Sequence, residues 1–232
     1  MKIDYIIKLG GSLLYDFQKT KKLLEKLYLD KSGNFAVTIG SGKLGEIYKS
    51  FLSDLGDDKV SFNDSVRNYS NVQSINASVL ASLNNNYVVC TNQQEVNNVL
   101  EKGGIPILDS RGFMHVFQNN KYQRGDVRAA NLCNYFDCNT LIIITNVNGV
   151  YDKDPKKNPD SHILKVITPD ELETMGRTSV DDGLAEKIRN YNLNCYVLGI
   201  DCLLNTNCKM DDDVFEMGTK IKGREKVYEK KN

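Results

Sequence analysis

The sequence predicts a three-layer αβα sandwich with a mostly parallel central sheet. Short apolar runs alternate along the chain with longer segments in which apolar residues recur at helical spacing. This alternation is typical of buried parallel strands whose connecting helices cover both faces of the sheet. The first 56 residues contain the same unit of strand, glycine turn and helix twice, and a length of 232 residues suits a single domain of this class.

The first unit opens with Ile3 to Leu9, an apolar run that predicts a strand. Gly10-Gly11-Ser12 ends the run in a turn, and Leu23, Leu24 and Leu27 mark the apolar face of the following helix. Glycines let backbone N–H groups approach a phosphate, and the helix N-terminus and Lys8 at the strand end add positive charge. The turn is a candidate phosphate site, although a purely structural strand-to-helix turn explains it equally well.

The second unit has Phe35 to Ile39 as its strand and Gly40-Ser41-Gly42 as its turn. The apolar positions of its helix are Leu44, Ile47, Tyr48, Phe51, Leu52 and Leu55. With Lys43, the turn invites interpretation as a P-loop. That motif needs glycine where Val37 stands and serine or threonine where Leu44 stands, so we reject it.

Further apolar runs complete the predicted sheet. They are Tyr87 to Cys90, Ile105 to Leu108, Thr140 to Ile144 and Cys195 to Leu198. The segment Phe113 to Phe117 alternates apolar and polar residues, which favours a strand with one exposed face. In sheets of this class ligands bind beyond the carboxyl ends of the strands, where both glycine turns fall.

The composition of the chain argues against nucleic-acid-binding, membrane and disulfide-rich proteins. Thirty Lys and Arg balance thirty Asp and Glu, so no bulk field indicates a nucleic-acid partner. No apolar run is long enough to cross a bilayer and no signal peptide is evident, so we expect a cytoplasmic protein without a membrane partner. The six cysteines are scattered without a C-x-x-C pair, which favours buried thiols over disulfides or a metal site.

The segment Thr145 to Asp160 carries the most specific pattern. It joins a strand end, an Asn-Gly turn and an acidic loop braced by prolines. Its hydroxyl, amide, aromatic and carboxylate groups could contact a base and a ribose. A surface hairpin turn is the alternative interpretation.

Together these motifs resemble the amino acid kinase superfamily, and its uridylate kinase branch of archaeal type most closely. The motifs are Lys8-x-Gly-Gly-Ser, the second glycine turn, Thr145 to Pro155, Thr168-Pro169-Asp170-Glu171-Leu172 and Gly218-Thr219. The resemblance spans roughly residues 2 to 221 and implies a carbamate kinase-like sandwich. It implies a single domain over 1–232, with an acceptor-side lobe over about 1–137 and a nucleotide-side lobe over about 138–222.

The resemblance also implies ATP as phosphate donor, with Mg²⁺, and a set of site residues. Lys8, Gly10, Gly11 and Ser12 would hold the β- and γ-phosphates, and Gly42 would pack near the reacting groups. Asp126 would orient the catalytic lysines, of which Lys187 would be the second, unless Lys187 belongs to a solvated helix face. Thr145, Asn146, Tyr151 and Asp154 would line the adenosine.

The acceptor side departs from the uridylate kinase pattern. Glu46 stands where that branch typically has an arginine, and its glycine-rich acceptor segment is replaced by Phe117 to Asp126, of which only the final aspartate matches. The acceptor candidates that remain are Ser41, Asp64 and Arg124. Lys121 and Arg128 also flank Asp126 and are weaker candidates for a phosphate clamp.

The leading functional hypothesis is therefore phosphoryl transfer from ATP to a phosphorylated small molecule, with UMP as the first choice. A kinase for another phosphorylated acceptor is the second, and a nucleotide-binding assembly subunit without turnover, similar to molybdenum storage proteins, is the third. By resemblance we expect a homo-oligomer, either a dimer or a hexamer.

Overall fold

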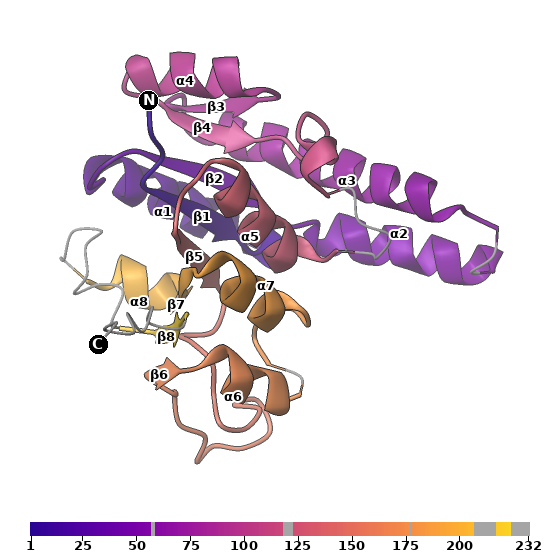
Figure 1. Ribbon diagram of the computed structural model, residues 1–232, viewed down its shortest axis with the longest axis vertical. Coiled ribbons are helices and arrows are strands. Elements are labelled where there is room, and N and C mark those ends of the chain that lie inside the picture. Colours follow the sequence, from indigo (N-terminus) through magenta and orange to yellow (C-terminus); the bar gives the residue numbers. More distant parts are fainter. Residues whose placement is uncertain (57–58, 118–122, 177, 207–216, 224–232) are drawn as a thin grey trace, which may run out of the picture.

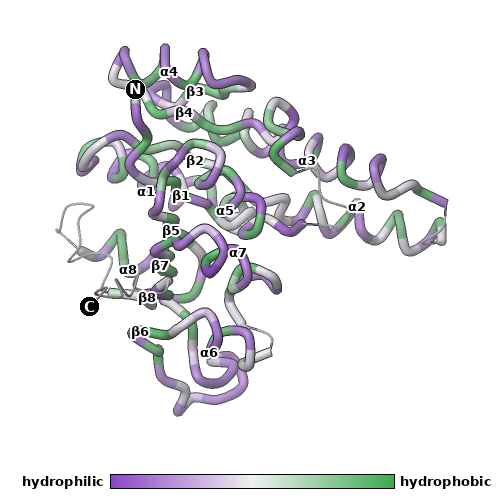
Figure 2. Tube along the Cα trace, in the orientation of Figure 1, coloured by the Kyte–Doolittle hydropathy of each residue, from purple (hydrophilic) through white to green (hydrophobic). Residues whose placement is uncertain are grey.

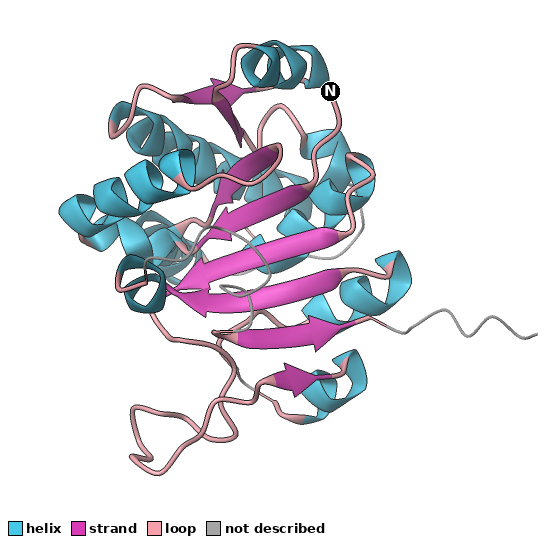
Figure 3. Cartoon of the chain, turned by 90° about the vertical axis from the view of Figure 1, so that its left-hand side faces the viewer, coloured by secondary structure: helices cyan, strands magenta, loops and turns pink. Residues whose placement is uncertain are grey.

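The computed structural model describes residues 1–56, 59–117, 123–176, 178–206 and 217–223. Its centre is an eight-stranded sheet in the order β3-β4-β2-β1-β5-β7-β8-β6 (Figures 1 and 3). The strands are β1 (Tyr5–Leu9), β2 (Phe35–Ile39), β3 (Tyr87–Cys90), β4 (Ile105–Leu108), β5 (Thr140–Thr145), β6 (Val166–Ile167), β7 (Asn194–Gly199) and β8 (Thr219–Lys222). All neighbouring pairs are parallel except β7 and β8, which are antiparallel.

Helices cover both faces of this sheet and enclose two apolar cores. The helices are α1 (Phe17–Leu29), α2 (Gly42–Leu55), α3 (Phe62–Ser82), α4 (Gln93–Glu101), α5 (Gly125–Tyr135), α6 (Pro169–Thr174), α7 (Leu184–Tyr191) and α8 (Ile200–Leu204), with short 3-10 helices η1 (Gly11–Tyr15) and η2 (Met114–Phe117). One core contains residues of α1, α3 and α8, and the other contains residues of α4, α5 and α7. Within the described ranges, no helix has both the length and the apolarity needed to cross a membrane.

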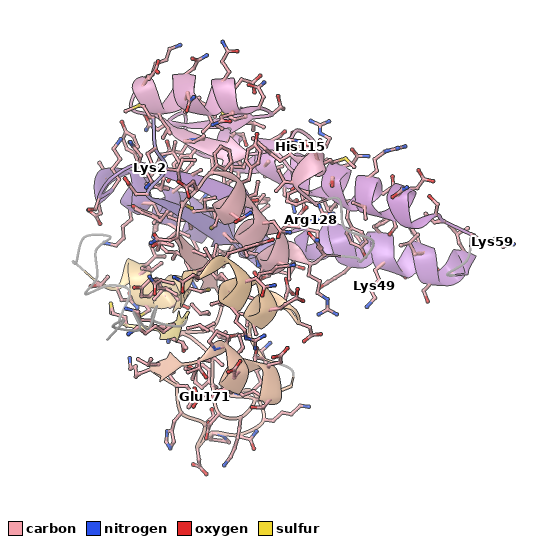
Figure 4. The ribbon with its side chains drawn as sticks, viewed as in Figure 1. Lys2, Lys49, Lys59, His115, Arg128 and Glu171 are labelled. Atoms are coloured by element: carbon pink, nitrogen blue, oxygen red, sulfur yellow. The ribbon has the colours of Figure 1, made fainter. Side chains whose placement is uncertain are left out.

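The predicted sandwich and its mostly parallel sheet are confirmed, and several strand limits agree with the sequence to the residue. The segment Phe113 to Phe117 is the exception, because it forms η2 rather than a strand. The ring of Phe113 is buried against Phe136, and His115 packs edge-on against Tyr135 (Figure 4). Contacts with α5 and the residue after it therefore decide that this segment is helical, although its alternating apolar and polar residues favoured a strand.

Two features of the topology place the site. β1 pairs with β2 on one side and with β5 on the other, and all three strands are parallel. The turns that follow β1, β2 and β5 therefore lie at the same edge of the sheet. Crevices at such switch points are where open α/β sheets bind ligands. The long helices α2 and α3 extend beyond the sheet from this edge (Figure 1).

Candidate active site

A cavity of about 930 Å³ opens where the three strand ends meet. Lys8 and both glycine turns form its floor, and Thr145 closes one side. Its walls continue onto α2 and α3 in one direction and onto Arg124, Gly125 and Asp181 in the other. The cavity therefore joins residues predicted for the donor to residues predicted for the acceptor.

The two glycine turns touch each other through their backbones. A Cβ atom added at Gly11 would lie 2.6 Å from the carbonyl oxygen of Gly40 and even closer to the amide nitrogen of Gly42. Gly42 has φ +52°, and a Cβ there would lie 2.5 Å from the carbonyl oxygen of Gly11. Side chains at either position would force the turns apart, which explains why both are glycine. The result is a cavity floor without side chains at these positions, which lets a phosphate chain approach closely.

Lys8 and Asp126 form a buried ion pair at the cavity floor. Lys8 Nζ lies 2.6 Å from Asp126 Oδ1, and the exposed fractions of the two side chains are 12% and 3%. Beyond this contact, Asp126 Oδ1 has no hydrogen-bond partner among the described residues. Burial lowers the pKa of Lys8, but the charges of Asp126 and Asp181 outweigh it and the pKa is raised. The lysine stays protonated.

Asp181 is a site residue that sequence reasoning missed. Its carboxylate accepts a hydrogen bond from the backbone N–H of Asp126, and Asp126 Oδ2 accepts one from the N–H of Asp181, both at 2.9 Å. Burial, together with the charge of Asp126, raises the pKa of Asp181 to about 6. The signal in the sequence was the acidic pair Asp181-Asp182 directly before Gly183 at the start of α7.

The raised pKa of Asp181 predicts a pH-dependent stability. The folded protein binds this proton more tightly than the unfolded chain does, so the free energy of unfolding falls as the pH rises from about 4 to about 6. The Asp181→Asn variant should be more stable than wild type at pH 8, by on the order of 2 kcal/mol, because it keeps an acceptor oxygen without the charge. Urea unfolding at pH 4 to 8 measures the pH dependence of the free energy of unfolding and the difference between the variant and wild type. Asp182→Asn is the control, because that side chain is 76% exposed; equal pH slopes for Asp181→Asn and wild type would contradict the assignment.

Arg124 and Arg128 have different roles in the structure. Arg124 lines the cavity, with its guanidinium 3.6 Å from Asp182 Oδ2. Arg128 is 3% exposed and donates hydrogen bonds to the side chains of Ser70 and Gln73, so it joins α5 to α3. The weaker proposal of a phosphate clamp at Arg128 is therefore not supported, and Lys121 lies outside the described residues.

The predicted adenosine segment starts at the cavity and then leaves it. Thr145 lines the cavity, and Asn146 Nδ2 donates to Ser12 Oγ at 3.0 Å, which joins this segment to the first glycine turn. Tyr151 pairs with Ile163 in an antiparallel bridge. Asp154 is exposed, and its carboxylate accepts from the backbone N–H of Lys156. Neither Tyr151 nor Asp154 lines the cavity.

Two predicted residues lie apart from the cavity lining. Lys187 Nζ is 3.3 Å from Glu186 and lies over the ring of Tyr191. Asp64 is exposed in the first turn of α3, where its carboxylate contacts Ser61 and Arg67. Ser41, in contrast, lines the cavity beside Gly42.

Comparison with known proteins connects this geometry to a family. The model of the Amino acid kinase family matches residues 5–199. The chain belongs to the amino acid kinase family. Members of this family are phosphotransferases, and both glycine turns, Asp126 and Asp181 lie within the matched range.

Relatives and solved structures agree with this membership. The chain is 28% identical over 206 residues to a uridylate kinase from Methanococcus aeolicus, covering 81% of this chain and 85% of the relative. It is 29% identical over 201 residues to a uridylate kinase from Methanocaldococcus jannaschii, covering 79% and 84%. The crystal structure of a uridylate kinase from Archaeoglobus fulgidus superimposes with a TM-score of 0.70 at 19% identity, over 94% of this chain and all of the other. That of an aspartate kinase from Synechocystis gives 0.72 at 15% identity, over 95% of this chain and 40% of the other. The structural matches establish the amino acid kinase fold.

Proposed function

We propose that this protein transfers the terminal phosphate of ATP to a small acceptor that already carries a phosphate, and that the acceptor is UMP. The observation that carries the proposal is the buried Lys8–Asp126 pair at a cavity that both glycine turns line. Relatives that cover most of the chain are uridylate kinases, which supports the choice of acceptor.

The residues present suit a triphosphate. Gly10, Gly11 and Ser12 line the cavity and would hold the β- and γ-phosphates, because glycines allow a close approach to the backbone and Ser12 adds a hydroxyl. Thr145 and Asn146 would lie at the start of the adenosine contact. Bound with ATP, Mg²⁺ would supply charge neutralisation at the phosphates. Asp181, which lines the cavity, would be its carboxylate ligand, since Mg²⁺ commonly combines one or two carboxylates with substrate phosphates.

Phosphoryl transfer needs positioning and positive charge more than a protein nucleophile. Lys8 supplies that charge, since Asp126 and Asp181 keep its ammonium protonated. Asp126 fixes where the ammonium lies, and the backbone N–H of Asp181, which precedes α7, fixes Asp126. Lys187 would act as a second phosphate contact only after its ammonium leaves Glu186 and Tyr191.

A coupled assay of ADP release tests the proposal. Release with UMP supports it, and release only with another phosphorylated acceptor supports a kinase with a different substrate. Binding of an ATP analogue without release for any acceptor would favour a nucleotide-binding assembly subunit. Glu46, which stands where the uridylate kinase pattern has an arginine, is the feature that favours a nucleotide-binding subunit without turnover.

The predicted adenosine segment, Thr145 to Asp160, gives a separate prediction. We expect Tyr151→Ala and Asp154→Ala to raise the KM for ATP more than they lower kcat, because these residues would contact the base and ribose rather than the transferred phosphate. Steady-state kinetics over a range of ATP concentrations measure both constants. His162→Ala is a suitable control on the same loop. A fall in kcat at unchanged KM would show that Tyr151 and Asp154 do not form the adenosine wall.

We further propose that the expected homo-oligomer covers the outer edge of α2. Leu44, Ile47, Phe51 and Leu55 recur along one side of this helix and are 39 to 60% exposed, and Figure 2 shows hydrophobic residues out to the end of the helix. A second copy of this chain, which has no net charge, would meet little repulsion there. Phe51→Glu should lower the mass measured by light scattering after size exclusion, whereas Ser50→Glu on the same helix should not. An unchanged mass for Phe51→Glu, or a monomeric wild type, would exclude this interface.

A further inference from the structure

The part of the cavity that lies beyond the glycine turns has its own chemistry. Its walls are the α2 residues Gly45, Glu46, Lys49, Leu52 and Ser53 and the α3 residues Ser65 and Tyr69. This half contains a cation, a carboxylate, two hydroxyls, an apolar side chain and an aromatic ring. Such a mixture suits a small polar molecule that carries both charge and a sugar or ring.

Lys49 is centrally placed on this wall. Gly45, Lys49 and Ser53 follow at intervals of four, so they form one line on the side of α2 that faces the cavity. Figure 4 shows Lys49 projecting from the edge of α2 that is turned away from α3. Long side chains on a helix lean toward its N-terminus. The Cα–Cβ bond of Lys49 is thus tilted toward the start of α2.

The charges around the cavity single out Lys49. Lys8 is paired with Asp126, and Arg124 lies 3.6 Å from Asp182. Among the described residues, no carboxylate lies within ion-pair distance of Lys49. Glu46, the acidic neighbour, also faces Tyr15 in η1, whose pKa is raised by burial and by this carboxylate. Lys49 is the uncompensated positive charge in this half of the cavity.

We propose that Lys49 binds the phosphomonoester of the acceptor and selects for acceptors that carry one. This assignment rests on the function proposed above, because it assumes that the acceptor binds in this half of the cavity. Lys49, one turn further along α2 than Glu46, is the cation on this wall that holds the phosphate of the acceptor. Ser53, Ser65 and Tyr69 line the space that the rest of the acceptor fills.

Calorimetric titration of the full-length protein, saturated with Mg²⁺ and a non-hydrolysable ATP analogue, tests this assignment. The probes are UMP, CMP and ribose 5-phosphate, with uridine as the probe that lacks phosphate. We expect Lys49→Gln to raise the Kd of the phosphorylated probe that binds wild type best by roughly 10- to 100-fold, as the loss of a charged hydrogen bond does. Lys49→Arg should retain binding within a few-fold, and the affinity for uridine should not change.

Lys59→Gln is the matched control. It removes the same charge at the far end of the α2–α3 pair, and Lys59 does not line the cavity (Figure 4). Equal Kd values for wild type and Lys49→Gln would overturn the proposal, as would a wild-type protein that binds none of the phosphorylated probes.

The outcomes separate this inference from the proposed function. Lys49-dependent binding of a phosphorylated probe without any ADP release would support the anion site and contradict catalysis. ADP release that is unaffected by Lys49→Gln at low acceptor concentration would support catalysis and contradict the anion site. A matching rise in the acceptor KM, with the KM for ATP unchanged, supports both.

Discussion

The Lys8→Met variant is expected to lose at least two orders of magnitude in turnover. The ammonium of Lys8 would stabilise charge on the transferring phosphate, and removing one group of this kind typically costs several kcal/mol of transition-state stabilisation. The variant should also be less stable, because Asp126 is buried and its Oδ1 has no second partner among the described residues. Breaking a buried pair by removing one member typically costs about 3–5 kcal/mol. The ADP-release assay and urea unfolding measure the two effects separately.

A second variant separates stability from catalysis at this position. Lys8→Met combined with Asp126→Asn removes both charges and should recover most of the lost stability while turnover stays low. Lys19→Met is the control for the ion pair itself, because Lys19 and Asp201 lie at the same 2.6 Å but are 31% and 60% exposed. That variant should change little. Normal turnover in Lys8→Met would remove this lysine from the mechanism.

Gly11→Ala is expected to damage both the fold and the activity. The added Cβ would lie 2.6 Å from Gly40 O and 2.6 Å from Gly42 Cα, which are backbone atoms that cannot rotate away. Overpacking of this kind costs roughly 1–3 kcal/mol or more. Separation of the two turns should also lower kcat/KM for ATP by about 100-fold or more, because misplaced contacts in phosphoryl transfer are costly.

Gly10→Ala is the matched control in the same turn. Gly10 has φ −61°, and a Cβ there would meet its nearest atom, Ile144 O, at an ordinary 3.4 Å. This variant should fold with nearly wild-type stability. If Gly11→Ala and Gly10→Ala were equally stable and equally active, the close contact between the two turns would be needed neither for stability nor for activity.

Most of the fold was predictable because its strands are short, apolar and buried. The limits of β2, β3 and β4 agree with the sequence to the residue, whereas β1 starts at Tyr5 rather than Ile3. β6 and β8 were missed. β6 has only two residues, and the sequence Thr-Lys-Ile-Lys of β8 alternates too briefly to be distinguished from a loop. Their pairing depends on contacts between distant parts of the chain.

The site was predictable where its chemistry is local. Lys8 and the first glycine turn are adjacent in sequence, and they line the cavity together. Asp181 could not be identified this way, because it reaches the site only by exchanging hydrogen bonds with Asp126, 55 positions earlier. Arg128 shows the converse. Its position two residues after Asp126 suggested a phosphate contact, but two residues turn a helix by about 200°, and its side chain hydrogen-bonds to α3 instead.

The contact between Gly11 and Gly42 also bears on how such a protein can change its substrate. Because Gly11 and the start of α2 approach each other through main-chain atoms, substitutions from Glu46 onward can alter the acceptor wall while this approach is kept. Donor chemistry and acceptor choice are thus separable within one helix. Redesign of acceptor preference should begin at positions 46, 49 and 53 and leave the first turn of that helix untouched.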